Sequence, residues 1–318
     1  MMRQQRSVIT MILFLQIVSG CHQTFDPYGA YEPKLVVYGI LSSRSDTQYV
    51  RVYSTYPPGV NPATLPNANQ VTDANVVVAE GDSTFEFRDT TIMSRISTGA
   101  GTPIRIHVAY GFPIIQDRFY RLLVSSPSLG TVTSTTRSLR AGSFSLLNKS
   151  VLSAPALSNT IDILVSPGGN VRAYIIRFYI IYEILNGNSW EERTIEVPIT
   201  LGEAGPVFPR PIPRGGGSPG YLPGTEIIFF STAAYATTVQ QLTAQYPAGT
   251  LRLKYARFIY TQMDDAIYAY YNVVNGFPDA GTLRLDEPDF TNIVGGLGIF
   301  GTTTERVDTA GLPSQLSF

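Results

Sequence analysis

One stretch constrains the fold of this chain more than any other: residues 171–184, which read VRAYIIRFYIIYEI. Its side chains alternate with the period of two that a β-strand has, and both of the resulting faces are largely apolar. A strand with two apolar faces must be covered on both sides, so it belongs at the centre of a sheet. The Asn186-Gly187 pair that follows predicts a tight hairpin turn into a further strand at 190–197. The stretch therefore predicts a mainly β fold built around a central strand.

The first part of the chain repeats this pattern in shorter segments. Residues 34–42 read KLVVYGILS and residues 48–56 read QYVRVYSTY, where Val50 and Val52 alternate with tyrosine and arginine. About seven such segments lie between residues 34 and 140, separated by turns that contain Gly or Pro. Short strands at this spacing are typical of immunoglobulin-like sandwiches. We therefore predict an N-terminal β-sandwich over residues 34–140.

A second β domain is predicted over residues 141–301. The Ser- and Ala-rich stretch at 139–157 has weak periodicity and marks the boundary between the two domains. Residues 206–224 are rich in Pro and Gly and predict a long loop that builds no core. Residues 302–318 carry no sustained period and predict a loose tail or an edge strand.

Two short helices are predicted within this second domain. Residues 237–246 carry apolar side chains at helical spacing and are followed by Pro247, which ends a helix. Residues 265–275 show the same spacing, and the acidic pair Asp264-Asp265 at their start suits the positive end of a helix dipole. The predicted fold class is therefore mainly β, with two immunoglobulin-like or β-sandwich-type regions and one or two short helices in the C-terminal part.

The N-terminus has the pattern of a signal peptide over residues 1–20. Arg3 and Arg6 give a basic start, and an almost continuous apolar run follows at residues 9–18. That run is too short to span a bilayer, which takes about 20 apolar residues, but it has the length of a signal-peptide core. The segment therefore predicts export of the chain.

Cys21, the only cysteine of the chain, comes directly after the small residues Ser19 and Gly20. Small side chains before a cysteine suit a peptidase that cuts ahead of a diacylated thiol, so we predict lipidation of Cys21 with palmitate-like acyl chains. Each buried methylene contributes about 0.8 kcal/mol, so two or three chains anchor a protein firmly. Residues 21–33 then form a tether. An ordinary secretory signal with a coincidental cysteine is the alternative.

Charge and cysteine content exclude two classes of protein. The whole chain has a formal charge of −1, and loss of Arg3 and Arg6 with the signal peptide gives −1 − 2 = −3. A near-neutral chain lacks the basic surface of a nucleic-acid-binding protein, so we predict no nucleic-acid partner. Once Cys21 is lipidated, no thiol remains for a disulfide scaffold.

Side chains suited to catalysis or metal binding are few. The chain has two histidines: His22 beside the anchor, and His107, which the strand alternation places on a polar face as a surface residue. A zinc site needs several His or Cys ligands, and a serine nucleophile needs an oriented base. Residues 286–289 (DEPD) favour a solvated turn over a calcium site. Glu191-Glu192 favours an exposed pair, although the two carboxylates of a glycosidase are defined in space and not in sequence. We predict no catalytic residue, no cofactor and no metal.

Residues 287–301, EPDFTNIVGGLGIFG, resemble the C-terminal signature of an uncharacterised Bacteroidota lipoprotein family, domain of unknown function 4249. The first strand KLVVYGILS and the segment DDAIYAYYNVV at 264–274 extend the resemblance over nearly the whole mature chain. The resemblance implies an outer-membrane lipoprotein that accompanies energised, TonB-dependent transporters, and it brings no catalytic residues. We expect a structural role for the signature, in which glycine permits backbone that other residues avoid. The residues that carry it are Asn292, Gly295, Gly296, Gly298, Phe300 and Gly301.

Three functions are compatible with these features. The first is a non-enzymatic, lipid-anchored accessory that binds a ligand or partner in an outer-membrane uptake system. The second is a surface glycan- or peptide-active hydrolase that uses carboxylates, and the third is an adhesin or structural envelope protein. His22, and not an aspartate, follows the cysteine, which gives no argument for inner-membrane retention; the periplasmic and cell-surface faces both stay open. Loop tyrosines such as Tyr56 and Tyr221 are open to a binding role.

Overall fold

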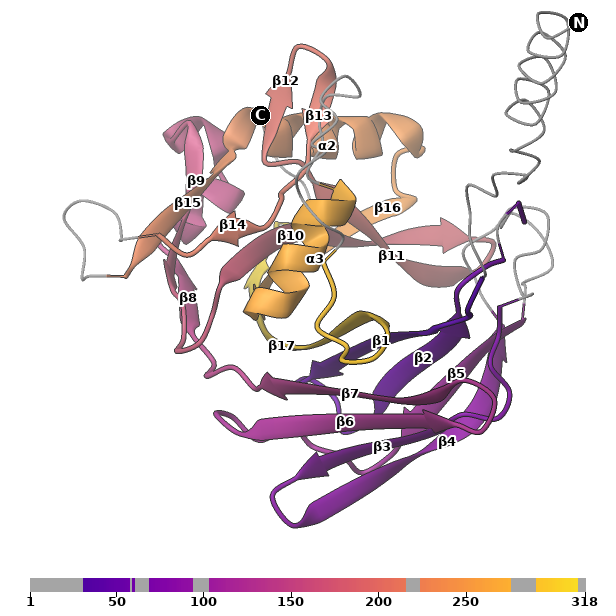
Figure 1. Ribbon diagram of the computed structural model, residues 1–318. Coiled ribbons are helices and arrows are strands. Elements are labelled where there is room, and N and C mark those ends of the chain that lie inside the picture. The colour runs from indigo at the N-terminus through magenta and orange to yellow at the C-terminus, as the bar shows by residue number, and fades with distance from the viewer. Residues whose placement is uncertain are drawn as a thin grey trace, which may run out of the picture.

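The computed structural model describes residues 31–57, 59–60, 69–93, 103–215, 224–275 and 290–313 (Figure 1). It is mainly β, as predicted, with two α-helices in the C-terminal half. Its strands, α-helices and 3-10 turns are, in chain order, β1 (Leu35–Ser42), β2 (Gln48–Ser54), β3 (Asn75–Glu80), β4 (Ser83–Met93), β5 (Pro103–Ala109), β6 (Phe119–Ser126), β7 (Gly130–Arg137), β8 (Ser143–Leu146), η1 (Lys149–Leu152), η2 (Pro155–Leu157), β9 (Thr160–Ser166), β10 (Ala173–Asn186), β11 (Ser189–Val197), β12 (Thr200–Gly202), β13 (Gly205–Val207), β14 (Ile212–Pro213), β15 (Glu226–Ser231), α2 (Thr232–Gln245), β16 (Leu251–Met263), α3 (Asp265–Asn275) and β17 (Leu297–Gly311).

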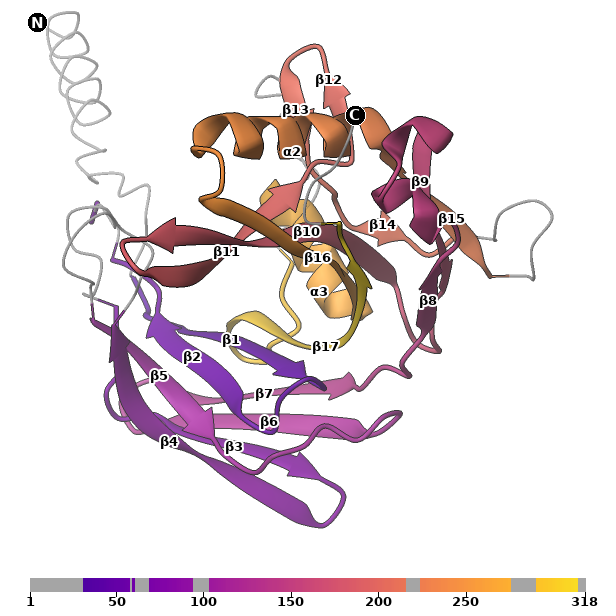
Figure 2. The same cartoon turned by 180° about the vertical axis from the view of Figure 1, so that it is seen from behind.

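A 12-stranded sheet runs through both halves of the molecule, in the order β11-β10-β16-β17-β1-β2-β5-β4-β3-β6-β7, with β14 beside β10. Strands β1 to β7 form the lower half in Figure 1, and the later elements form the upper half. β17 joins the two halves because it pairs antiparallel with β16 and parallel with β1. Figure 2 shows the same junction from behind.

The upper half is built around β10, the strand that the sequence places at the centre. β10 is an interior strand, as predicted, because it lies between β11 and β16, but its neighbour β11 is an edge strand of the 12-stranded sheet. One face of β10 and β16 packs against α2 and the three-stranded sheet β15-β9-β8. Phe178 of β10 is fully buried there and stacks on Phe258 of β16, with ring centroids 4.5 Å apart. On the opposite face of β10, Ile175 and Ile181 are buried as well, while Arg177 between them is exposed and Tyr179 is half-buried, so that face is covered only in part.

The lower half is a sandwich that the C-terminal segment completes. Inward-facing valines and leucines of β1, β2, β3, β6 and β7 share a core with Ile293 and Phe300. The chain before β17 also pairs with β7, the last strand of the sheet: the N–H of Val294 donates to the carbonyl of Thr133 (2.7 Å), and the reverse bond is 3.2 Å. Residues 34–140 therefore form the N-terminal sandwich only together with residues 292–300, which lie outside the predicted domain.

Several predicted elements shift in the structure. Residues 302–311 do not form a loose tail or an edge strand, because they continue β17 in the interior of the sheet. The helix predicted at 237–246 begins earlier, at Thr232, because Ser231 caps it by accepting a hydrogen bond from the N–H of Ala234. The loop predicted at 206–224 contains the short strands β13 and β14 in its described part, and residues 216–223 lie outside that part. The helix predicted at 265–275 is α3.

His107 is buried and not on the surface, contrary to the prediction from alternation. It is 3% exposed, and its neighbours Ile106, Val108 and Ala109 in β5 are buried as well. Both faces of this end of β5 are therefore covered, so alternation could not separate an outer face from an inner one. Burial lowers the pKa of His107, which favours a neutral imidazole.

Candidate functional site

The signature segment closes the sandwich through the side chain of Asn292. Its amide nitrogen donates to the carbonyl of Phe300 (2.6 Å), and its amide oxygen accepts from the N–H of Phe300 (2.8 Å). The side chain thus acts as a strand partner for one residue of β17. Phe300 is fully buried in the lower core.

Glycines of the signature allow the backbones of β1 and β17 to approach closely. A Cβ on Gly298 would lie 2.0 Å from the carbonyl oxygen of Val37, and its φ of +108° is one that L side chains rarely adopt. A Cβ on Gly296 would lie 2.6 Å from the carbonyl oxygen of Leu35. Gly295 has a φ of +83°. These contacts are packing contacts of backbone against backbone, and they give the segment a structural role.

Gly301 makes room for a buried carboxylate, that of Asp264, which is 6% exposed. A Cβ on Gly301 would lie 2.9 Å from its Oδ1. Oδ1 accepts from the N–H of Ile267 (2.9 Å) and so caps α3. Oδ2 accepts from the hydroxyl of Thr136 in β7 (2.8 Å) and from the N–H of Thr302 in β17 (2.7 Å). Burial raises the pKa of Asp264 above its ordinary value, although these donors oppose the shift.

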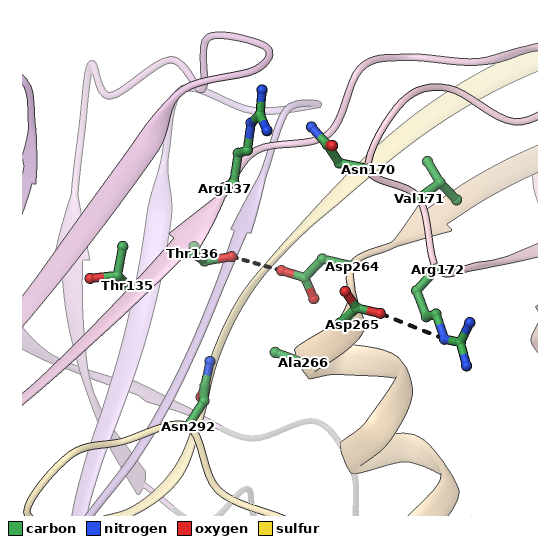
Figure 3. Close-up of a pocket in the computed structure, with 10 residues that line it drawn as sticks. All are labelled: Thr135, Thr136, Arg137, Asn170, Val171, Arg172, Asp264, Asp265, Ala266 and Asn292. Carbon is green, nitrogen blue, oxygen red and sulfur yellow. Dashed lines mark hydrogen bonds and ion pairs between the residues drawn. The ribbon is translucent and has the colours of Figure 1, made fainter.

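Asp264 lies at the floor of a first hollow, of about 380 Å³, which we call the polar cavity (Figure 3). Its lining comes from β7, the segment before β10, the start of α3 and Asn292, where the two halves meet. The lining residues are Thr135, Thr136, Arg137, Asn170, Val171, Arg172, Asp264, Asp265, Ala266 and Asn292.

The charges around the polar cavity are paired within the protein. Arg137 Nη2 lies 2.6 Å from Asp117 Oδ1, and Arg172 Nε lies 3.6 Å from Asp265 Oδ1. Arg140 also binds Asp117, and these cations lower the pKa of that carboxyl. The Asp264 oxygens are already occupied by donors from three elements. The arrangement serves to join β7, β17 and α3, and leaves little for a ligand to bind.

A second hollow, of about 420 Å³, has a different character, and we call it the tyrosine cavity. It lies on the outer face of β1 and β2, beside α3 and the start of β17. The lining residues are Val36, Tyr38, Tyr53, Ser54, Thr55, Tyr56, Asn69, Tyr270, Phe290, Thr291, Leu297 and Gly298. None of these twelve side chains is charged. Pockets of this size, mostly apolar with a few polar groups, are typical of small-ligand sites.

Tyrosine rings form the wall of this cavity. The ring of Tyr38 meets that of Tyr270 edge-on at 6.0 Å between centroids, and that of Tyr53 at 6.5 Å. Burial, together with the neighbouring Tyr270 hydroxyl, raises the pKa of Tyr38 to about 12. The Tyr38 phenol therefore stays neutral at physiological pH and offers its hydroxyl group as a donor and an acceptor.

The polar side chains of the cavity adjoin the chain that leads back toward Cys21. The hydroxyl of Thr55 accepts from the N–H of Lys34 (3.1 Å) and lies 3.0 Å from the Tyr31 hydroxyl. Asn69 donates from Nδ2 to the carbonyl of Ser54 (3.2 Å). Its Oδ1 is buried, and no described residue lies within hydrogen-bond distance of it.

Other residues singled out in the sequence do not form a site. Glu191 pairs with Arg193 (2.5 Å) and Glu192 lies 3.6 Å from Lys254, so both act as ion-pair partners on the sheet surface. Cys21, His22 and residues 286–289 lie outside the described residues. Within the described part of the chain, no three His, Cys, Asp or Glu side chains gather as metal ligands would. No helix in that part has the length and apolarity needed to cross a bilayer.

The tyrosine cavity as a whole was not predicted from the sequence, although Tyr56, one of the two loop tyrosines left open to a binding role, lines it. The other, Tyr221, lies outside the described residues. A second signal was present in β2. Tyr49, Arg51 and Tyr53 occupy the face of β2 that the valines leave to the outside, as the alternation predicts. Large aromatic rings on an outer face are a sign of a covered or ligand-binding surface. The alignment of that face with Tyr270 of α3 depends on tertiary packing, which alternation does not reveal.

Comparisons with known proteins identify a family and little else. The family model for DUF4249, a domain of unknown function, matches residues 23–309. No curated protein matches the chain. Among solved structures, the chain is similar to the C-terminal globular domain of an oligosaccharyltransferase from Pyrococcus abyssi, at 14% identity and a TM-score of 0.25. That match covers 69% of this chain and 44% of the other, and at this score it supports no functional argument.

Proposed function

The chain belongs to the DUF4249 family, and from this premise we propose that it is a lipid-anchored cell-envelope protein that binds a ligand or partner without catalysing a reaction. Acyl chains on Cys21 hold it at the outer membrane, where it serves as an accessory of an uptake system. The observation that supports a binding role is the tyrosine cavity, an uncharged hollow with aromatic walls. Catalysis of acid–base type needs titratable groups within reach of a substrate, and the lining of this cavity has only tyrosines of that kind.

The position of the cavity supports the anchored arrangement. Thr55 of the cavity wall binds Tyr31 and Lys34, near the end of the tether. Tyr31 lies ten positions after Cys21 in the sequence (31 − 21 = 10). A fully extended chain of that length spans at most about 35 Å. A lipid on Cys21 would therefore hold the cavity within that distance of the membrane surface.

Two further functions have weaker support. Among the described residues, Asp264 and Asp265 are the two carboxylates that line the polar cavity, and a hydrolase could draw on them. The donors on Asp264 favour a capping role for it instead. An adhesin or structural role would use exposed strands and loops.

The experiment that tests the proposal compares the full-length chain with a Cys21→Ala variant in the native envelope. We expect labelled palmitate on the wild-type chain alone, and outer-membrane fractionation of the wild-type chain alone. We also expect a TonB-dependent transporter to co-purify with C-terminally tagged wild type in mild detergent. An unlabelled wild-type chain would contradict the anchor, and labelled chain without any co-purified transporter would contradict the accessory role.

A further inference from the structure

We infer that the tyrosine cavity binds a neutral oligosaccharide, that is, an uncharged ligand with both apolar ring faces and hydroxyl groups. The inference rests on the proposed binding function and names its ligand class. It is argued from the chemistry of the cavity wall, from the row of side chains beyond it, and from the absence of charge among the described residues that line it.

The lining selects against charged ligands. A carboxylate or ammonium group that enters the cavity loses hydration, and no lining side chain carries a compensating charge. Arg51 opposes Tyr38 in the neighbouring strand, but it is exposed and is not one of the residues that line the cavity. A ligand without charge therefore enters at the lowest cost.

The wall matches the two kinds of surface that a sugar presents. Tyr38, Tyr53, Tyr56 and Tyr270 give aromatic faces for the C–H groups of a ring, and their phenols can hydrogen-bond at the same time. The hydroxyls of Ser54, Thr55 and Thr291 add further partners.

A row of outer-face side chains extends the cavity along β1 and β2. Val36 opposes Tyr53 at the cavity, and four residues further along β1 the pair Ile40 and Tyr49 lies on the same face. Ile40 is 46% exposed and Tyr49 is 52% exposed. Four residues of strand span about 13 Å, which is longer than one sugar ring, so the surface suits a chain of sugars more than a single unit.

The test is saturation-transfer NMR on the full-length chain purified in detergent. The probes are a panel of neutral glucan and xylan oligosaccharides, an oligogalacturonate as the acidic counterpart, and an end-blocked neutral tripeptide. We expect a neutral oligosaccharide to bind at millimolar concentration or better. Binding confined to the acidic sugar or to the tripeptide, or no binding of any neutral oligosaccharide, would overturn the inference.

Variants locate the binding to the cavity. Tyr53→Ala and Tyr270→Ala should each weaken binding several-fold to about tenfold, because each removes one stacking face. Tyr110→Ala is the matched control, since Tyr110 is 70% exposed and does not line the cavity. If an alanine variant fails to fold, Leu297→Trp replaces it: Leu297 is 38% exposed on the cavity wall, and an indole there should fill the space and abolish binding.

These outcomes separate the ligand from the wider function. Neutral sugar binding that all three cavity variants leave unchanged would overturn the cavity as the site. If no neutral oligosaccharide binds but the transporter still co-purifies with wild type, the proposed accessory role stands and only the ligand class is wrong. Conversely, if wild type binds a neutral oligosaccharide but carries no labelled palmitate, the proposed ligand class stands and the proposed lipid anchor is wrong.

Discussion

At the scale of the residue, Asp264 is the side chain that links the largest number of elements around the polar cavity. Its carboxylate joins β7, β17 and α3, and it is nearly inaccessible to solvent. A carboxylate supplies acceptors only, whereas an amide replaces one of them with a donor. Replacing Asp264 with the isosteric asparagine should therefore lower the stability more than the same replacement of a surface aspartate.

We expect Asp264→Asn to lower the free energy of unfolding by roughly 2 to 3 kcal/mol, because the new amide group faces N–H and hydroxyl donors that it cannot satisfy. The measurement is the urea midpoint with its slope. Asp265→Asn is the matched control: its side chain is 90% exposed and its ion pair with Arg172 is long, at 3.6 Å, so its effect should stay within about 0.5 kcal/mol. Equal losses in both variants would contradict the role assigned to Asp264.

The pH dependence of that difference follows from the raised pKa of Asp264. As pH rises through the ordinary value of 3.8, the unfolded chain releases this proton first, which favours unfolding until the folded carboxyl ionises too. The contribution of Asp264 to the free energy of unfolding is thus greatest at low pH and falls as pH rises. The stability difference between wild type and Asp264→Asn should be larger at about pH 3.5 than at neutral pH. A difference that grows with pH would show a lowered pKa instead.

At the scale of the element, the glycines of the signature allow β17 to pair closely with β1. Its parallel pairing with β1 starts at Val36 and Leu297 and continues for the length of β1. Gly298 sits at the tightest point, where a methyl group would overlap the carbonyl of Val37.

We expect Gly298→Ala to destabilise the protein by roughly 3 kcal/mol or more, because it adds an unfavourable φ to a clash with backbone that cannot move alone. Gly311→Ala is a control in the same strand, since a Cβ there would meet nothing within 4 Å. Thermal unfolding of the two variants is the measurement. A neutral Gly298→Ala would mean that β1 and β17 separate more easily than their register indicates.

The sequence predicts elements well where the signal is local. Alternation marked β2 and β10, and the Asn186-Gly187 turn marked the β10–β11 hairpin, where Gly187 has a φ of +60°. The position of residues 302–311 inside the sheet could not be predicted in the same way. The partners of β17 are one strand just before α3 and another at the start of the chain, and pairing over such separations depends on the whole fold. For the same reason the tyrosines of the cavity were visible in the sequence while the cavity was not.

At the scale of the whole molecule, the two halves form one structure with two cores. Each core draws on the C-terminal part of the chain: Ile293 and Phe300 lie in the lower core, and Ala310 and Leu312 pack against the upper one. Neither half is complete without the stretch from 290 to 313.

We therefore expect a chain that ends at residue 289 to lose cooperative unfolding in both halves, because β1 and β16 each lose a neighbouring strand. Hydrogen exchange should show loss of protection in β1 and β16 together. A chain that ends at residue 313 is the control, since it retains every strand in the described part of the molecule. Persistent protection of either half in the shorter chain would show that this half folds alone.

The place of β17 also has a consequence for how the protein is made. Many chains fold domain by domain as they leave the ribosome, N-terminal part first. Here β17, which completes the first half, follows every other described strand in the sequence, so the growing chain holds no finished half until residues 290–311 have been made. If the chain is exported as proposed, a nascent chain without β17 is still unfolded enough to pass through a translocation channel. A chain that lacks β17 has neither core complete, so we expect proteases to cleave it more readily than the full chain.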